Sequence, residues 1–142
     1  MSFSLDMSAF TAKTEKQLSV VVRKTAIGLF SAVMKSSPVD SGRLRGAWMI
    51  DINKFSTTAP TTIRSDAAVT AEIIGTSSQY KAGDVITFSN NVEYAPILEY
   101  GLFPWANSAK VVNHFSTQSP AGFVRINVMK FQTFVNQASK GL

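Results

Sequence analysis

The chain contains no cysteine and only one histidine among its 142 residues. The absence of thiols excludes disulfides, thiolate zinc sites and cysteine nucleophiles. His114 stands in a predicted loop without a second histidine at metal-ligand spacing. Serine is abundant, but no GxSxG segment and no phosphate-binding glycine loop is present. We therefore expect no enzyme and no cofactor.

Charged residues are also scarce, at 16% of the chain, although the net charge is +5. Lysine and arginine are scattered along the sequence, whereas DNA-binding proteins usually gather them in one stripe. A surface poor in charge is more typical of a protein covered by neighbouring subunits. No continuous apolar run reaches the ~20 residues of a membrane span, and the first six residues lack a signal-peptide pattern, so we expect no membrane association.

The apolar fraction of 45% is that of one folded domain, which we place at residues 1–142. Hydrophobic periodicity predicts an α+β fold. It has a long N-terminal helix, an antiparallel sheet of three to four strands, and a C-terminal helix packed on one face of the sheet. The predicted elements are a helix at 8–34, strands at 44–52, 69–74 and 84–89, a helical turn at 96–100, a long irregular loop at 101–118, and a last helix opened by Ser119 and Pro120.

Residues 37–48 combine turn-forming residues with charges. Pro38 and Gly42 favour a rigid turn, which delivers Arg43 and Arg45 to the start of a strand, two residues apart and therefore on one face. Two interpretations remain open at this point. The arginines form a solvated face on a connector, or they contact carboxylates on a neighbouring subunit or DNA in a channel.

Residues 90–101 carry two tyrosines, Tyr94 and Tyr100, and two acids, Glu93 and Glu99. The aromatic side chains either seal an edge of the sheet or form an interface patch, since tyrosine, tryptophan and arginine dominate protein–protein contacts. Phe103 and Trp105, which follow at once in the loop, favour the interface. A catalytic pair of acids is imaginable, but ion pairs at a surface or interface explain the glutamates better.

Three segments together resemble a known family. They are residues 38–45 (PVDSGRLR) with Trp48 soon after, residues 90–101 (NNVEYAPILEYG) and residues 119–125 (SPAGFVR). In this order they are similar to the PVDTGRLR, NNVPYAxxLEYG and PAGMVR segments of the tail-completion or neck proteins of long-tailed, non-contractile bacteriophages, also described as minor tail components. The departures are Ser41 in place of threonine, Glu93 in place of proline and Phe123 in place of methionine.

The resemblance implies a structural virion protein of the phage neck, assembled in the host cytoplasm. Such a protein forms a ring, expected to be a hexamer, that completes the tail and joins it to the head. It contacts a tail-tube or tail-terminator protein and a head-side connector or stopper, and double-stranded DNA passes without sequence recognition. The three roles of completion, terminator and stopper stay open, as does a different class, a small basic DNA-binding or packaging accessory protein.

Under the family interpretation, specific residues meet other subunits. We expect Arg43 and Arg45 to pair across subunits with acids, for which Glu93 and Glu99 are the candidates. The aromatic residues of the 101–118 loop are expected to dock on a neighbouring neck or tail protein. The full set of predicted interface residues is Arg43, Arg45, Glu93, Tyr94, Glu99, Tyr100, Phe103 and Trp105.

Overall fold

The computed structural model describes residues 3–142, with side chains from Thr14 onward, and has an α+β fold. The predicted class and the long N-terminal helix are confirmed. In chain order the elements are α1 (Phe3–Ser36), the 3-10 helix η1 (Arg45–Ala47), β1 (Trp48–Ile52), α2 (Asp66–Ser77), β2 (Ile86–Asn90), α3 (Ala95–Tyr100), β3 (Val111–Val112), β4 (Phe115–Ser116), α4 (Arg125–Val128) and α5 (Phe131–Ala138).

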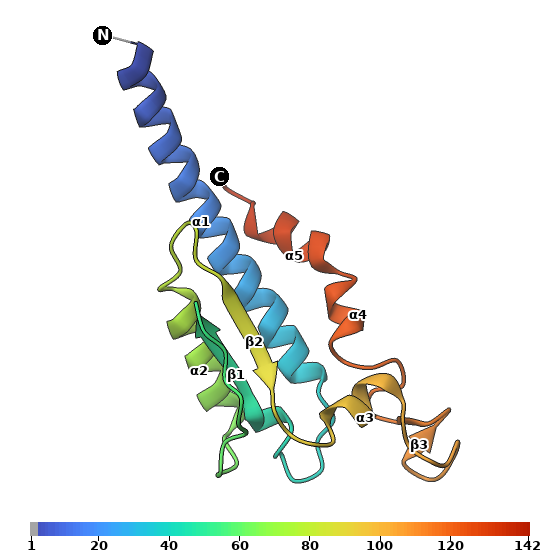
Figure 1. The fold of residues 1–142 in the computed structure, drawn as a ribbon. Helices are drawn as coiled ribbons and strands as arrows, with labels where there is room; N and C mark the ends of the chain where they lie inside the picture. The colour runs from blue at the N-terminus through green and yellow to red at the C-terminus, as the bar shows by residue number, and fades with distance from the viewer. Residues whose placement is uncertain (1–2) are drawn as a thin grey trace.

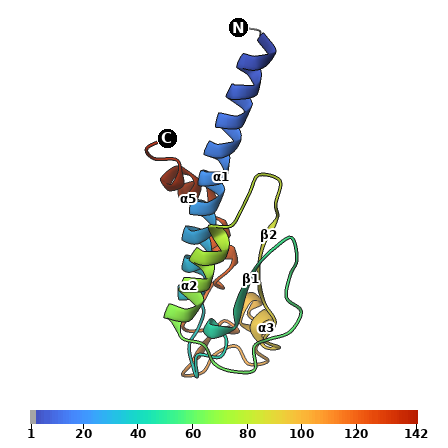
Figure 2. The ribbon, with the colours of Figure 1, turned by 90° about the vertical axis from the view of Figure 1, so that its left-hand side faces the viewer.

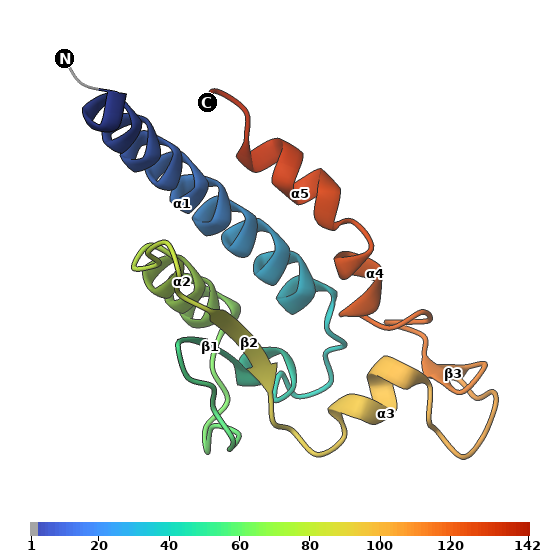
Figure 3. The same ribbon diagram turned by 45° about the horizontal axis from the view of Figure 1, so that its top comes forward.

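Helix α1 is the axis of the molecule. Its 34 residues span about 50 Å, and its N-terminal part stands clear of the other elements (Figure 1). Further along, α2 and the β1–β2 pair lie on one side of α1 and α5 on another, as Figure 3 shows. The turned view of Figure 2 places the strands and α1 in separate layers.

The core lies between α1, α2 and the antiparallel pair β1–β2, in which Ile50 is opposite Phe88. The Phe88 ring stacks between Phe30 of α1 and Trp48 of β1, with ring centroids 4.5 Å apart on each side. Phe123, from the distant C-terminal region, meets Trp48 edge-on at 6.2 Å. These offset and edge contacts are the arrangements that aromatic rings favour.

The predicted strand at 69–74 is wrong, because these residues belong to α2. The side chain of Ser65 accepts a hydrogen bond from the Ala68 N–H and caps the helix, and Val69 and Ile73, four residues apart, are buried on one face. β-branched residues made the segment resemble a strand. Two separate two-stranded sheets result, β1–β2 and β3–β4, in place of one sheet of three to four strands.

The C-terminal region also differs from the prediction. Ser119 and Pro120 open no helix; they lead into a turn at Gly122, and the helices α4 and α5 follow later. Helix α5 packs along α1, because α1 and α2 already cover the inner face of the β1–β2 pair. Gly28 of α1 permits this approach: a Cβ there would lie 3.2 Å from the Phe134 ring.

Within the part of the chain that the structure describes, residues 14–36 of α1 are the one segment with the length and composition of a membrane span. The core helix of a folded domain meets the same criteria. Here the segment packs against both α2 and α5, and the guanidinium of Arg23 on it donates to the Tyr80 carbonyl at 2.8 Å. Of its most apolar stretch, 28% is buried within the structure.

Candidate functional site

The first of the three segments forms a turn at the end of α1. The Ser37 hydroxyl donates to the Val33 carbonyl at 2.9 Å and accepts from the Trp48 indole N–H at 2.8 Å. Gly42 adopts a φ of +88°, which a residue with a Cβ rarely tolerates. The turn is therefore fixed to the core at one end and reverses direction at the other.

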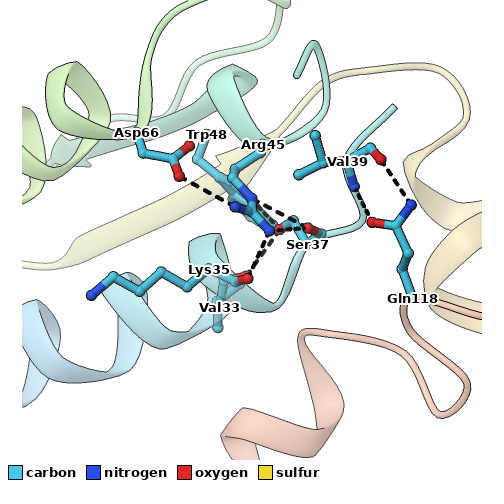
Figure 4. A network of polar contacts seen from close by, with 8 residues as sticks. All are labelled: Val33, Lys35, Ser37, Val39, Arg45, Trp48, Asp66 and Gln118. Carbon is cyan, nitrogen blue, oxygen red and sulfur yellow. Dashed lines mark hydrogen bonds and ion pairs between the residues drawn. The ribbon is translucent and has the colours of Figure 1, made fainter. Parts of the chain in front are cut away.

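Arg45 is engaged within its own chain (Figure 4). Its guanidinium donates to the carbonyls of Lys35 at 2.9 Å and Ser37 at 3.0 Å, and it pairs with Asp66 at 3.2 Å. It thus satisfies carbonyls at the C-terminal end of α1 and binds the first turn of α2, where an acid is favourable to the helix dipole. These contacts account for Arg45 without a second subunit.

Glu99 joins the second segment to the third. Its carboxylate accepts hydrogen bonds from the backbone N–H groups of Phe123, Val124 and Arg125 at 2.8, 2.9 and 3.0 Å, and from the Arg125 side chain at 3.0 Å. Burial alone raises the pKa of Glu99, but these hydrogen bonds outweigh it and hold the pKa below its ordinary value of 4.5. Gly122 is required beside it, because a Cβ there would lie 2.8 Å from the Glu99 carbonyl oxygen.

Arg43 and Glu93, by contrast, form an open ion pair between the first and second segments. Their closest atoms are 3.4 Å apart, and the side chains are 42% and 84% exposed. The Arg43 guanidinium also lies over the Tyr94 ring, 5.7 Å from its centre. Because an exposed pair of this kind contributes little to stability, both charges can exchange partners at small cost. The expectation of pairing between subunits therefore rests on Arg43 and Glu93, not on Arg45 and Glu99.

The predicted irregular loop contains a short hairpin, β3–β4. Asn113 and His114 have φ values of +49° and +69°, as a two-residue hairpin turn of the primed type requires. The His114 Nδ1 atom lies within hydrogen-bond distance of the Phe103 carbonyl oxygen, at 2.6 Å. The Phe103 ring stacks on the Trp105 ring, with ring centroids 5.5 Å apart. The single histidine thus has a structural role in holding the aromatic pair, and Trp105 remains 51% exposed.

These parts surround one groove of about 700 Å³. The first segment contributes Arg43, α3 and its approach contribute Tyr94 and Leu98, and the loop contributes Phe103 and Trp105. The structure therefore brings together four residues that the sequence placed in an interface, Arg43, Tyr94, Phe103 and Trp105. Glu93 lies beside them through its pair with Arg43.

Gln118 closes the groove and was not found from the sequence. Its side-chain amide accepts from the Val39 N–H at 2.7 Å and donates to the Val39 carbonyl at 2.8 Å, as Figure 4 shows. This double hydrogen bond joins the first turn to the far end of the loop. A glutamine in a polar loop carries no signal that would reveal such a partner.

Tyr100 lies outside the groove lining. Its ring is covered by the Arg125 guanidinium at 4.9 Å from the ring centre, and the residue is 56% exposed. Tyr100 is thus an exposed residue at the end of α3, beside the buried Glu99.

In the region from residue 14 onward, where side chains are described, no three acidic or histidine side chains gather closely enough to hold a metal ion. No protein-family model matches this sequence. No curated protein matches it either, and neither does any solved structure. What this chain can do must therefore be inferred from its residues and from the geometry of the groove.

Proposed function

We propose that this chain is a structural virion protein of the head–tail junction of a long-tailed phage. It forms a ring, expected to be a hexamer, that completes the tail and joins it to the head while DNA passes. Tail completion, tail termination and the head-side stopper are three versions of this role. The localisation that goes with the proposal is the neck of the virion.

The observation that carries the proposal is that the three segments of the resemblance form one connected unit. Glu99 of the second segment binds the backbone of the third at Phe123. The Asn90 side chain donates to the Leu44 carbonyl at 2.8 Å and so joins the second segment to the first. Residues that carry the resemblance thus contact one another in one part of the fold, although they are spread across most of the chain.

The groove beside this unit supplies a surface for a neighbouring protein. A stacked aromatic pair, of which Trp105 is exposed, lies beside an arginine, and this composition is typical of energetically important interface sites. The predicted sheet of three to four strands also belongs to this proposal: the single subunit has pairs of strands, and strands from neighbouring subunits in a ring would enlarge the β1–β2 sheet.

The proposal is tested by the mass of the purified protein in light scattering, alone and mixed with tails from virions that lack it. We expect a discrete oligomer, or a monomer that becomes a ring only at the end of a tail. A monomer that ignores tails but binds DNA, with an affinity that falls steeply as salt rises, would favour the DNA-binding accessory instead.

The substitution Arg43→Glu tests the exposed ion pair. We expect it to prevent ring assembly or joining, because it places like charges beside Glu93, while the free energy of unfolding changes by less than about 1 kcal/mol. Lys130→Glu makes the same change of charge at an exposed position away from the groove and is the control. Rings of Arg43→Glu that assemble and join heads to tails normally would show that this pair is not in the interface.

A further inference from the structure

Strand β2 has one unpaired edge. The Asn53 N–H donates to the Val85 carbonyl at 2.8 Å, which sets the alternation of the ladder: residues 85, 87 and 89 face β1. Ile86 and Phe88 therefore direct their backbone groups away from β1. Among the described residues, no hydrogen bond joins the N–H or C=O of either one to a group outside the β1–β2 pair.

The opposite edge of the same sheet is covered at the first residue of β1. The Arg64 guanidinium lies along β1, where it donates to the carbonyls of Gly46, at 2.9 Å, and Trp48. Exposed edges are usually also protected by lysine, proline or a bulge, and β2 has none of these. The outer edge of β2 is thus left ready to pair with another strand.

An apolar trough of about 280 Å³ lies beside this edge. Ile86 of β2 forms one wall, Phe131 and Val135 of α5 form the other, and Val22 and Leu29 of α1 lie among the floor residues. Figure 3 shows α1 between β2 and α5. Phe131 is 50% exposed although it lines the trough, so apolar surface remains to be covered.

The combination of edge and trough selects an extended strand as the occupant. A helix in the trough would bury the backbone groups of Ile86 and Phe88 without partners, which is costly. A strand satisfies these groups and places alternate side chains in the trough, as in other cases of strand addition.

The connection at 53–64 of the same chain has the pattern of such a strand. From 55 to 63 the large apolar residues, Phe55 and Ile63, stand at odd positions. The other odd residues are Thr57, Ala59 and Thr61, and the even residues are Ser56, Thr58, Pro60 and Thr62. Phe55 is 67% exposed and Ile63 is 58% exposed, while Ala59 packs partly against its own core. From 57 to 63, within the described chain, the backbone makes no hydrogen bond. Proline at position 60 is compatible with a strand added at an edge.

We infer that residues 57–63 of a second copy of this chain add to the outer edge of β2 and place Ile63 in the trough. The connection ends at Arg64 on the β1 edge, and the trough lies on the β2 edge, so donor and acceptor are on opposite sides of one sheet. Such a contact is head-to-tail, and repeated copies form a ring where the rotation from one copy to the next closes. The inference rests on the proposed ring and names the contact that holds its subunits together.

A matched pair of substitutions at Ile86 tests the edge. Ile86→Pro removes the outward N–H and no ladder hydrogen bond, whereas Ile86→Ala removes the same side chain but keeps the N–H. We expect the concentration for half-assembly, measured by analytical ultracentrifugation, to be about tenfold or more higher for Ile86→Pro than for Ile86→Ala. Equal assembly of the two variants, with native circular dichroism in both, would overturn the inference.

A second pair tests the donor segment and does not depend on how well a proline variant folds. Ile63→Asp places a charge on the apolar side of the strand, and Thr62→Asp places it on the other side. Assembly should be lost in the first and kept in the second. In the unmodified protein, the backbone amides of Ile86 and Phe88 should exchange their hydrogens fast in the monomer and be protected from exchange in the oligomer.

The outcomes separate this inference from the proposed function. A ring that joins heads to tails with Ile86 and Phe88 amides unprotected would refute the strand contact and leave the function standing. An oligomer whose Ile86 and Phe88 amides are protected but which does not bind tails would support the strand contact and refute the proposed function. Amides that become protected only when tails are added to a monomer would show that a partner protein supplies the strand, and would refute the second copy as donor.

Discussion

At the scale of single residues, chemically similar side chains have different roles. Arg45 and Glu99 are enclosed by contacts within the chain, whereas Arg43 and Glu93 remain open to solvent. The sequence could identify all four as important, because each stands in a turn-rich segment. It could not separate them, since the partners of Glu99 lie more than twenty residues away in the chain.

The substitution Glu99→Gln should lower the free energy of unfolding by about 2 kcal/mol, because hydrogen bonds to a charged, buried acceptor are replaced by weaker ones. Glu93→Gln, at a side chain that is 84% exposed, should change it by less than about 0.5 kcal/mol. Urea unfolding at pH 7 measures both. Equal effects at the two positions would contradict the role assigned to Glu99.

The pKa of Glu99 makes a further prediction about acid stability. The folded state holds this pKa below the ordinary 4.5, so the unfolded chain takes up the proton first as the pH falls. The contribution is fully present above about pH 5 and is lost as the pH falls through the folded-state pKa. The difference in free energy of unfolding between the wild type and Glu99→Gln should therefore shrink as the pH falls below about 5. Urea unfolding repeated at several pH values measures it, and a difference that stays constant with pH would contradict the prediction.

At the scale of elements, local signals succeeded where the chain decides its own structure. The hydrophobic period of α1, the strand at β2 and the start of α3 at Ala95 and Pro96, with Gly101 after its end, were all predicted within a few residues. The strand prediction for 69–74 was wrong because β-branched residues can occupy either a strand or a well-capped helix. The last helix was predicted in the right region, where α4 and α5 lie, but its start was placed too early. Glu99, from another element, supplies the acceptor near the start of α4, and no local pattern shows this.

The junction of α3 and the hairpin can be tested at Gly101, which has a φ of +66°. A Cβ there would lie 2.5 Å from the Phe115 ring, so Gly101→Ala must both strain the backbone and displace the Phe115 ring. We expect a loss of about 1–3 kcal/mol in thermal unfolding. The double variant Gly101→Ala with Phe115→Ala should lose less than the sum of the two single variants, and additivity would contradict the contact.

At the scale of the whole molecule, the groove is the feature that no local pattern could predict in full. Its walls come from the turn after α1, from α3 and from the loop, and Gln118 fixes their spacing through Val39. From the sequence, aromatic and arginine residues could be selected as interface candidates because of their residue types. The sequence did not supply their proximity, which depends on contacts between distant parts of the chain.

Replacing Phe103 and Trp105 together by alanine should leave the fold intact but abolish joining of heads to tails, because the stacked pair, with Trp105 exposed, provides the docking surface. Met129→Ala, at a residue that is 85% exposed and distant from the groove, is the control. In vitro joining assays with circular dichroism of each variant provide the measurement. Normal joining by the double variant would exclude the groove as the docking surface.

The edge contact between Trp48 and Phe123 also bears on how the chain is made. Trp48 is synthesised early, and the ring that completes its surroundings comes near the C-terminus, as do the N–H groups that Glu99 needs. A growing chain therefore exposes an incomplete aromatic core until translation is almost finished. Premature termination before residue 123 would yield a fragment prone to aggregation or proteolysis, which leaves little chance that a partly made subunit competes with the finished one for a place in an assembly.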